Sequence, residues 1–397
     1  MSDGNFDNSG GSDVFVERTS QSWFGRIGDA FKSILFGLIL VIVAAILLFW
    51  NEGRAAHTAA ALAEGAGRVV SVDASRVDPV NEGKLVHLSG PTSLAAPVAD
   101  ADFRFGAEAL KLDRTVEMYQ WKEEKHTETH KNLGGSEETV TRYTYAREWS
   151  DKAVESGGFR EANGHRNPQF PRVGSRAFYP EGAKLGAFAI GAKVLAEVEA
   201  KDAFAPPPAA LAGARTLLGS RTDLAGGGVF SGADPDHPQV GDVRVTWRIA
   251  PVGELSVVGA QTGGAVAPSV AHNGEEVLLV ESGDVDATSM FKHGEEANAF
   301  LTWILRGAGV LVMFIGFRVA MTLVEVLADV VPLFGSIVGA GASLVALFCT
   351  LVLAPLIVAV AWLFYRPLTA VLVLAVGAGL AYFVHARARA RVAARPG

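Results

Sequence analysis

SILFGLILVIVAAILLFW, residues Ser33 to Trp50, is an unbroken apolar run near the start of the chain. A helix needs roughly 20 apolar residues to cross a bilayer core of about 30 Å, so this run predicts a transmembrane helix at 33–50. A second apolar zone fills most of residues 300–385, whereas residues 51–299 carry charges at an ordinary density. The expected fold is therefore that of an α+β membrane protein, with one N-terminal and three C-terminal transmembrane helices around a β-rich α+β extracytoplasmic domain.

The C-terminal apolar zone divides into three predicted spans, at residues 300–317, 334–364 and 368–384. Between the first two, residues 318–333 are expected to form an amphipathic connector. Residues 1–32 are expected to form a cytoplasmic segment whose juxtamembrane stretch is amphipathic, because Trp23, Ile27 and Phe31 recur every four positions. Residues 385–397 form a basic tail.

Basic residues set the expected orientation. Arg18, Arg26 and Lys32 precede the first span, and four arginines follow the last one. Cytoplasmic segments are enriched in Lys and Arg, so both termini are expected in the cytoplasm and residues 51–299 on the far side. The richness in Ala, Gly and Arg hints at a bacterium, in which case the protein lies in the inner membrane with a periplasmic domain. In a eukaryote it would lie in an endomembrane.

Composition narrows the class of partner and the redox chemistry. The net charge is −7, which argues against a nucleic-acid partner because such binding needs concentrated positive charge. The lipid bilayer is the partner that the apolar runs require. Cys349 is the only cysteine and lies in an apolar run, so the chain forms no internal disulfide.

Aromatic, alternating segments dominate the predicted soluble region. Residues 115–121 (TVEMYQW) and 140–149 (VTRYTYAREW) flank a polar stretch with two glycines, which predicts a long β-hairpin. Further strands are expected at 84–88, 242–249, 254–259 and 277–281. Residues 188–198 are compatible with a strand or a short helix. The Pro- and Ala-rich residues 203–213 suggest a linker and a possible break between subdomains.

A polar stripe interrupts the connector. Arg318, Thr322, Glu325 and Asp329 fall at i, i+4, i+7 and i+11, which is one face of a helix. Ionisable groups inside a membrane indicate function, such as a proton or ion path. The favoured alternative is a helix that lies flat on the cytoplasmic surface with its charges in water.

Small residues repeat along the span that follows. Gly335, Gly339 and Ser343 are four residues apart, so they share a face that lets another helix approach closely. This face is either an oligomer seam or, as we favour, a packing face for the chain's own helices.

Several segments together resemble one family, transmembrane protein 43, also called LUMA, and the chain looks like a bacterial member. The matches keep the family's order from about residue 24 to 387, and they depart from it in the first twenty residues and at the Pro triplet 206–208. The resemblance rests on the segments 50–55 (WNEGRA), 82–87 (EGKLVH), 116–121 (VEMYQW), 143–149, 164–168, 240–245 and 362–368 (WLFYRPL). Its motif residues are Asn51, Glu52, Arg54, Glu117, Tyr119, Trp121, His165, Asn167, Asp242 and Arg366.

The family resemblance implies a multi-pass membrane protein with the topology just derived. It also implies a scaffold that organises membrane protein complexes, with membrane-protein partners and a homo-oligomeric state. It supplies no catalytic residues. The alternatives are a membrane enzyme that acts on lipids or envelope components, and an oligomeric channel or transporter in which the polar stripe faces a cavity.

Local patterns give no catalytic or metal site. The chain has no G-x-S-x-G, H-E-x-x-H, P-loop or dinucleotide-binding pattern. His126 and His130 are four residues apart, but they lie on an expected strand where that spacing does not converge. Asp234, Asp236 and His237 alternate with prolines and predict a turn. We therefore expect no cofactor and no metal, and a structural hydrogen-bonding role for His165.

Overall fold

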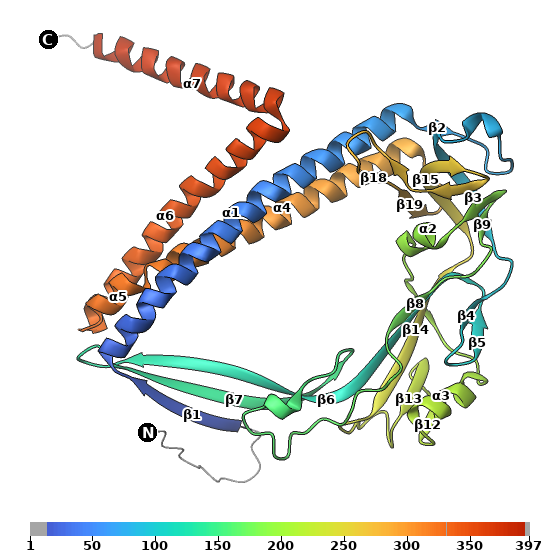
Figure 1. Ribbon diagram of the computed structural model, residues 1–397, viewed down its shortest axis with the longest axis horizontal. Coiled ribbons are helices and arrows are strands. Elements are labelled where there is room, and N and C mark those ends of the chain that lie inside the picture. Colours follow the sequence, from blue (N-terminus) through green and yellow to red (C-terminus); the bar gives the residue numbers. More distant parts are fainter. Residues whose placement is uncertain (1–13, 331, 394–397) are drawn as a thin grey trace. The chain divides into compact units, whose positions relative to one another are not determined.

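Long helices form one part of the molecule (Figure 1). The computed structural model describes residues 14–330 and 332–393. The helices are α1 (Trp23–Arg68), α4 (Ala287–Ala320), α5 (Thr322–Ala328), α6 (Pro332–Tyr365) and α7 (Pro367–Ala393). Together with the segment His130–Glu138, the ranges Ser20–Ala60 and Glu295–Gly397 form one compact unit, here called the helical unit. The ranges Met1–Thr19, Ala61–Thr129 and Thr139–Gly294 form the other, the β-rich unit.

Three helical segments among the described residues are long and apolar enough to cross a membrane. They are Trp23–Arg68, Ala287–Ala328 and Gly335–Tyr365. The apolar part of α7, Pro367–Gly377, is shorter. The structure thus has the expected N-terminal span and two of the three C-terminal ones, and the fourth span, 368–384, stays a prediction. α1 also continues without a break from Trp23, so the amphipathic stretch is the start of this helix and not a separate one.

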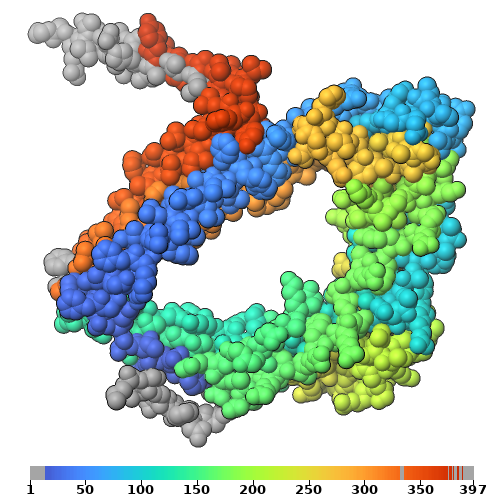
Figure 2. Space-filling model, in the orientation of Figure 1, coloured from blue at the N-terminus to red at the C-terminus, as the bar shows by residue number. Residues whose placement is uncertain are grey.

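Glycines let α1 and α4 approach each other closely. A Cβ built on Gly37 would lie 2.5 Å from the Gly316 carbonyl oxygen and from the Ala320 nitrogen, so only hydrogen fits there. Further along, Ala44 and Leu48 of α1 form a buried cluster with Met313 of α4 and Ala354 of α6. Figure 2 shows side chains of α1 and α6 side by side. The three apolar helices are therefore one packed bundle in the helical unit.

The β-rich unit contains two large sheets. The eight-stranded sheet has the order β1-β7-β6-β14-β13-β12, with β11 paired to β14 and β8 to β6. Its strands are β1 (Val14–Gln21), β6 (Ala109–Lys131), β7 (Glu137–Ser150), β8 (Arg176–Phe178), β11 (Asp202–Phe204), β12 (Thr222–Ala225), β13 (Gly228–Ser231) and β14 (Val243–Pro251).

The second sheet has seven strands in the order β19-β15-β16-β10-β9-β3-β2, with β15 also paired to β3. Its strands are β2 (Val70–Ser71), β3 (Leu85–Ser93), β9 (Lys184–Leu185), β10 (Phe188–Ile190), β15 (Glu254–Thr262), β16 (Ala265–Ala267) and β19 (Leu279–Ser282). Two small sheets pair β4 (Val98–Asp100) with β5 (Phe105–Ala107) and β17 (Ser269–Val270) with β18 (Glu276–Val277). The short helices are α2 (Ala192–Glu197), α3 (Ala210–Leu218), and the 3-10 turns Pro79–Asn81 and Ser156–Gly158.

These elements confirm the expected β-rich α+β class and most of the expected strands. The predicted hairpin is β6 and β7, and its turn glycines Gly134 and Gly135 have φ of 87° and 79°. β6 has 23 residues, about 75 Å of extended chain. The segment 188–198, which allowed a strand or a helix, contains both β10 and α2. The strand expected at 84–88 runs on to Ser93.

Residues 203–213 do not form an exposed linker. β11 pairs with β14, and Phe204, Ala210 and Ala214 pack in the same core as Val116 and Trp247. The change from one core to the other instead falls within strands, because Leu110 of β6 and Ala250 of β14 belong to the core of the second sheet. Although the composition of residues 203–213 is typical of a linker, apolar side chains among them are buried, and this burial stabilises the packed state.

Candidate functional site

The polar stripe meets the tip of the long hairpin in the helical unit. Asp329, which follows α5, is fully buried, and Glu325 is largely buried. Both carboxylates are paired with cations from other parts of the chain. We call this group the tip cluster; its charged members are Arg26, Lys131, Glu137, Arg318, Glu325 and Asp329.

Arg26, in the first turns of α1, uses its whole guanidinium in the tip cluster. Nε lies 2.9 Å from a carboxylate oxygen of Glu137, and the two terminal nitrogens donate to the Gly135 carbonyl at 2.7 Å and to Asp329 at 2.5 Å. Nearby, the Trp23 indole donates to the Val326 carbonyl at 2.9 Å. A Cβ on Gly135 would lie 2.4 Å from this indole ring, so the turn and α1 touch where only glycine fits.

Lys131, the last residue of β6, binds both acidic residues of the stripe. Its Nζ lies 2.9 Å from Glu325 and 2.9 Å from Asp329. Burial acts to lower the pKa of Lys131, but the hydrogen bonds and charges of Glu325 and Asp329 outweigh burial and raise it. Arg318 completes the cluster with a hydrogen bond of 2.6 Å to Glu325. Three cations thus balance three carboxylates, which is the condition for burying charge at a tolerable cost.

The small-residue face of α6 packs on this cluster. A Cβ on Gly335 would overlap the Asp329 carboxylate, and one on Gly339 would lie 2.9 Å from a Glu325 oxygen. Ser343, one turn further, donates to the Gly339 carbonyl of its own helix. Thr322 is the first residue of α5. The stripe therefore faces neighbouring segments of its own chain, so a helix with all its charges in water is not what the structure has.

One contact of the tip cluster bears on the expected division of the chain. Residues 130–138 were expected in the extracytoplasmic domain, and residues 1–32 and 318–333 on the cytoplasmic side. Lys131 and Glu325 are 2.9 Å apart, so they cannot lie on opposite faces of a bilayer core of about 30 Å. The hairpin tip therefore lies beside the start of α1 and the connector.

A second polar group surrounds Glu52 at the other end of the apolar run of α1. Glu52 is 1% exposed and forms a bidentate ion pair with Arg306 of α4, at 2.6 and 2.8 Å. The Trp362 indole of α6 donates to the same carboxylate at 2.8 Å. Asn51 donates to the Thr302 carbonyl at 3.1 Å. One carboxylate of α1 therefore ties both other apolar helices to it.

Arg54 extends this group with neutral partners. It donates to the Asn298 side chain and to the Thr302 hydroxyl, both at 2.9 Å. Its Nε is buried and has no hydrogen-bond partner. Arg366, at the turn between α6 and α7, lines a pocket of about 370 Å³ beside these residues.

The motif residues of β6 hold strands together in the β-rich unit. Glu117 forms a bidentate pair with Arg244, its partner in register on β14, at 2.7 and 3.0 Å. The Tyr119 ring lies 5.2 Å from that of Trp149. The Asp242 carboxylate accepts from the backbone N–H of Gln239 at 2.8 Å, which closes the turn before β14. These contacts are cross-strand and turn interactions of the kind that fix register.

His165 and Asn167 anchor a loop to the same hairpin. The His165 ring stacks on Tyr145 at 3.9 Å and meets the edge of Trp121 at 4.7 Å. The Asn167 amide accepts from the Trp121 backbone N–H at 2.7 Å and donates to the Trp121 carbonyl at 2.9 Å. Asn167 thus pairs with the strand as a neighbouring backbone would, and the His165 ring packs against two aromatic side chains of the hairpin.

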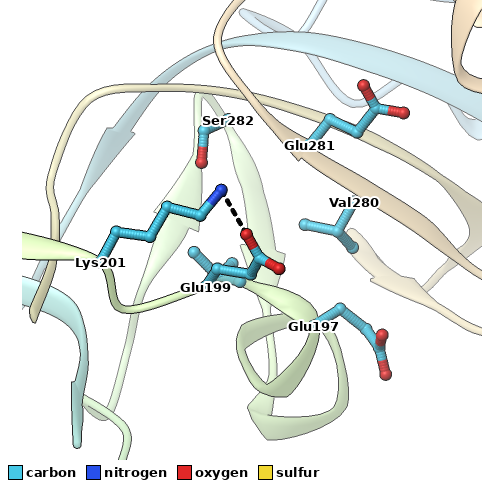
Figure 3. A pocket seen from close by; sticks show the side chains of 7 residues that line it. Glu197, Glu199, Lys201, Val280, Glu281 and Ser282 are labelled. Carbon is cyan, nitrogen blue, oxygen red and sulfur yellow. Dashed lines mark ion pairs between the residues drawn. The ribbon is translucent and has the colours of Figure 1, made fainter.

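The other polar groups have local roles. His126 lies 3.4 Å from Glu128 on an exposed part of β6, and His237 and Asp234 form an exposed pair at 2.9 Å in a turn. A pocket of about 410 Å³ in the β-rich unit is lined by Glu197, Glu199, Lys201, Glu281 and neighbours (Figure 3). Its Glu199–Lys201 ion pair is well exposed to solvent. Within the described residues, no group of three or more His, Cys, Asp or Glu side chains is arranged to hold a metal ion.

Comparison with known proteins shows the family to which the chain belongs. The family model of Transmembrane protein 43 matches residues 118–367. Transmembrane protein 43 of Homo sapiens is 32% identical over 396 residues, which is 96% of each chain. The chain belongs to the transmembrane protein 43 family. The Rattus norvegicus protein is 32% identical over 384 residues (93% of this chain, 94% of that protein), and the Drosophila melanogaster homolog 32% over 355 (87% and 92%). No solved structure matches the chain significantly.

Membership of this family confirms the resemblance seen in the motifs, but the tip cluster contains residues that the sequence did not single out as a site. In the sequence, Arg26 is recognisable only as a cytoplasmic charge, and no local pattern marks Lys131 or Glu137. Arg306, the partner of Glu52, was missed as well. The one available signal is a charge inside an apolar zone. Arg306 is such a charge, because it lies within the expected span 300–317.

Proposed function

We propose that this member of the transmembrane protein 43 family is a multi-pass membrane scaffold that organises membrane protein complexes through its β-rich domain. The observation that carries the proposal is the tip cluster. Its three cations and three carboxylates neutralise one another across α1, the hairpin tip and the connector. Such a network joins distant segments of one chain. Because these charges are satisfied within the chain, the scaffold would bind its partners through other, exposed surfaces.

The same observation weighs against the transport alternative. A proton or ion path needs a carboxylate that water or an ion can reach. Asp329 is 0% exposed, and Arg26 and Lys131 both bind it. The enzyme alternative has the pocket near Arg366 as its support, but that pocket contains no nucleophile and base within contact of each other. The scaffold therefore remains the function that the geometry supports best.

The orientation is part of the proposal. We propose that both termini lie in the cytoplasm and that, with the Lys131–Glu325 contact as support, the hairpin tip lies on that face too. Residues 51–108 and 168–286 are proposed to be extracytoplasmic. Arg160 lies 2.8 Å from Glu17 of the N-terminal segment, so the loop around it stays with the outer part of the hairpin. The outer part of the hairpin, 122–130, carries charges on both faces. Backbone of this kind is tolerated at membrane depth only where protein or water surrounds it. We therefore propose that the protein is a homo-oligomer in which further copies enclose the hairpin. We also propose that it lies in an inner membrane or an endomembrane.

The native mass of the protein in nanodiscs tests the scaffold. The expected result is a defined homo-oligomer that retains at least one membrane protein after crosslinking in cells and purification. A monomer that retains no protein would overturn the proposal. A monomer that binds a small molecule and converts it chemically would support the enzyme alternative instead.

Cysteine labelling tests the orientation. Cys349→Ser removes the native thiol, and Leu133→Cys then places one at the exposed hairpin tip. A second variant, Val270→Cys, marks an exposed position of the β-rich domain. With a membrane-impermeant maleimide on intact cells, we expect labelling at 270 and none at 133 until the membrane is permeabilised. Labelling at 133 in intact cells would refute the proposed orientation.

A further inference from the structure

A polar, aromatic pocket opens between α1, α4 and α6 in the helical unit. Its volume is about 370 Å³. It lies where the apolar run of α1 ends, and tryptophan is enriched at such membrane–water interfaces. The side chains that give the pocket its chemistry are Asn298, Thr302, Trp303, Arg306, Trp362 and Arg366.

Positive charge in and beside the pocket exceeds negative charge. Glu52, the buried carboxylate next to it, is already bound by both nitrogens of the Arg306 fork. Glu295 lines the rim and is exposed. Among the described residues, no carboxylate lies within salt-bridge distance of the Arg54 or Arg366 guanidinium. Neither guanidinium therefore has an ion pair of its own at this end of the helix. The charge of Arg366 acts on Glu52 from beyond salt-bridge distance, and Arg306 already binds that carboxylate.

The hydrogen bonds of Arg54 also indicate a site for an anion. Its partners are the neutral side chains of Asn298, Thr302 and Asn51, and its buried Nε has no partner. A partly buried cation gains from an anion because the low dielectric strengthens the attraction. The planar guanidinium of Arg366 has the fork of donors that matches the oxygens of a phosphate group.

We propose that this pocket binds the phosphate of an anionic phospholipid headgroup. Arg366 is the principal ligand for the phosphate oxygens, and Trp303 and Trp362 lie against the adjoining part of the lipid at the interface. Basic pockets between membrane helices recognise anionic headgroups in this way. The lipid then becomes part of the junction that Glu52 forms between the three helices. The proposal is independent of whether the protein acts as a scaffold.

Native mass spectrometry of the full chain tests lipid binding. The protein is reconstituted in nanodiscs with equal parts of phosphatidylglycerol and phosphatidylcholine, released, and examined for retained lipid. The variant is Arg366→Gln, which removes the charge without breaking an ion pair. The matched control is Lys32→Gln, an exposed cation at the opposite end of the same apolar run. Arg366→Lys keeps the charge but loses the fork.

We expect the wild type and Lys32→Gln to retain phosphatidylglycerol in preference to phosphatidylcholine. Arg366→Gln should weaken this retention about tenfold, and Arg366→Lys by less, because one charge-assisted contact is lost or degraded. Equal retention of the two lipids by the wild type would overturn the proposal, as would undiminished retention in an Arg366→Gln variant whose circular dichroism and elution volume are those of the wild type.

A free phosphate is the other source of the same chemistry, and a separate arm distinguishes it. In nanodiscs of phosphatidylcholine alone, millimolar inorganic phosphate is added and the tryptophan fluorescence is followed. If phosphate causes no fluorescence change that depends on Arg366, the lipid is supported as the ligand. A saturable change that Arg366→Gln abolishes, together with no preference for phosphatidylglycerol, would assign the pocket to soluble phosphate and refute the lipid.

Discussion

Asp329 is the residue on which the tip cluster depends. It accepts from Arg26 of α1 and from Lys131 of the hairpin, and it is fully buried. Removal of one partner from a buried ionic network leaves the others uncompensated, which is far more costly than loss of an exposed pair. This difference in cost gives a direct test with variants of opposite exposure.

Asp329→Asn should destabilise the protein by up to about 3–5 kcal/mol, because the buried Arg26 and the half-buried Lys131 each lose one of two counter-charges. The measurement is the thermal unfolding midpoint in detergent, together with trypsin cleavage after Lys131. Asp29→Asn is the control: its pair with Lys32 is exposed to solvent, so its loss should leave the midpoint almost unchanged. Equal midpoints for the two variants would contradict a cluster that holds the tip in place.

Tyr145 offers a test of the hairpin base that depends on pH. Burial, followed by the hydrogen bond to Glu123, raises the pKa of Tyr145 to about 12. A raised pKa means that the neutral hydroxyl is favoured in the folded state. The contact is thus complete below pH 10, the ordinary pKa of tyrosine, and is lost as the pH rises through about 12. In an absorbance titration of tyrosinate, Tyr145→Phe should remove a late step near pH 12. Loss of a step near pH 10 instead would show an ordinary, solvated hydroxyl.

At the scale of elements, the contact of α1 with α4 depends on backbone proximity. Gly37 meets the Gly316 carbonyl at a distance that admits no Cβ, whereas Gly28 of the same helix has nothing within 4 Å of its Cβ position. Small residues provide the close packing that stabilises helix pairs in lipid. The two glycines of α1 therefore predict opposite outcomes for the same substitution.

Gly37→Ala should lower stability by about 1–3 kcal/mol, since the added methyl separates the two helices. Gly28→Ala should raise it by up to about 1 kcal/mol, because alanine has the higher helix propensity. Thermal unfolding in the same detergent measures both. A neutral Gly37→Ala would mean that α1 and α4 do not pack as described.

Sequence patterns predicted the elements well but not what joins them. The apolar runs, the alternating aromatic strands and the Gly-Gly turn are local signals, and each corresponds to an observed element. Lys131 and Glu325 are 194 residues apart in the chain, so no local period relates them. The stripe was visible because its spacing is helical, whereas its partners Arg26 and Lys131 lie on segments with their own, unrelated periods. Glu52 is predicted as a family-motif residue at the end of the first span, but its partner Arg306 is 254 positions away and follows no common pattern with it.

For the whole molecule, the order of synthesis gives the ion pair between Glu52 and Arg306 a further consequence. The two residues are 254 positions apart. At about 5–20 residues per second, the ribosome needs roughly 13–50 s to reach Arg306 after it has made Glu52. During that interval α1 is already in the membrane with an unpaired carboxylate at its end. A nascent or truncated chain that lacks α4 therefore exposes a charge that quality-control proteases can recognise, and the completed chain conceals it. The pair can therefore form only after α4 has been made.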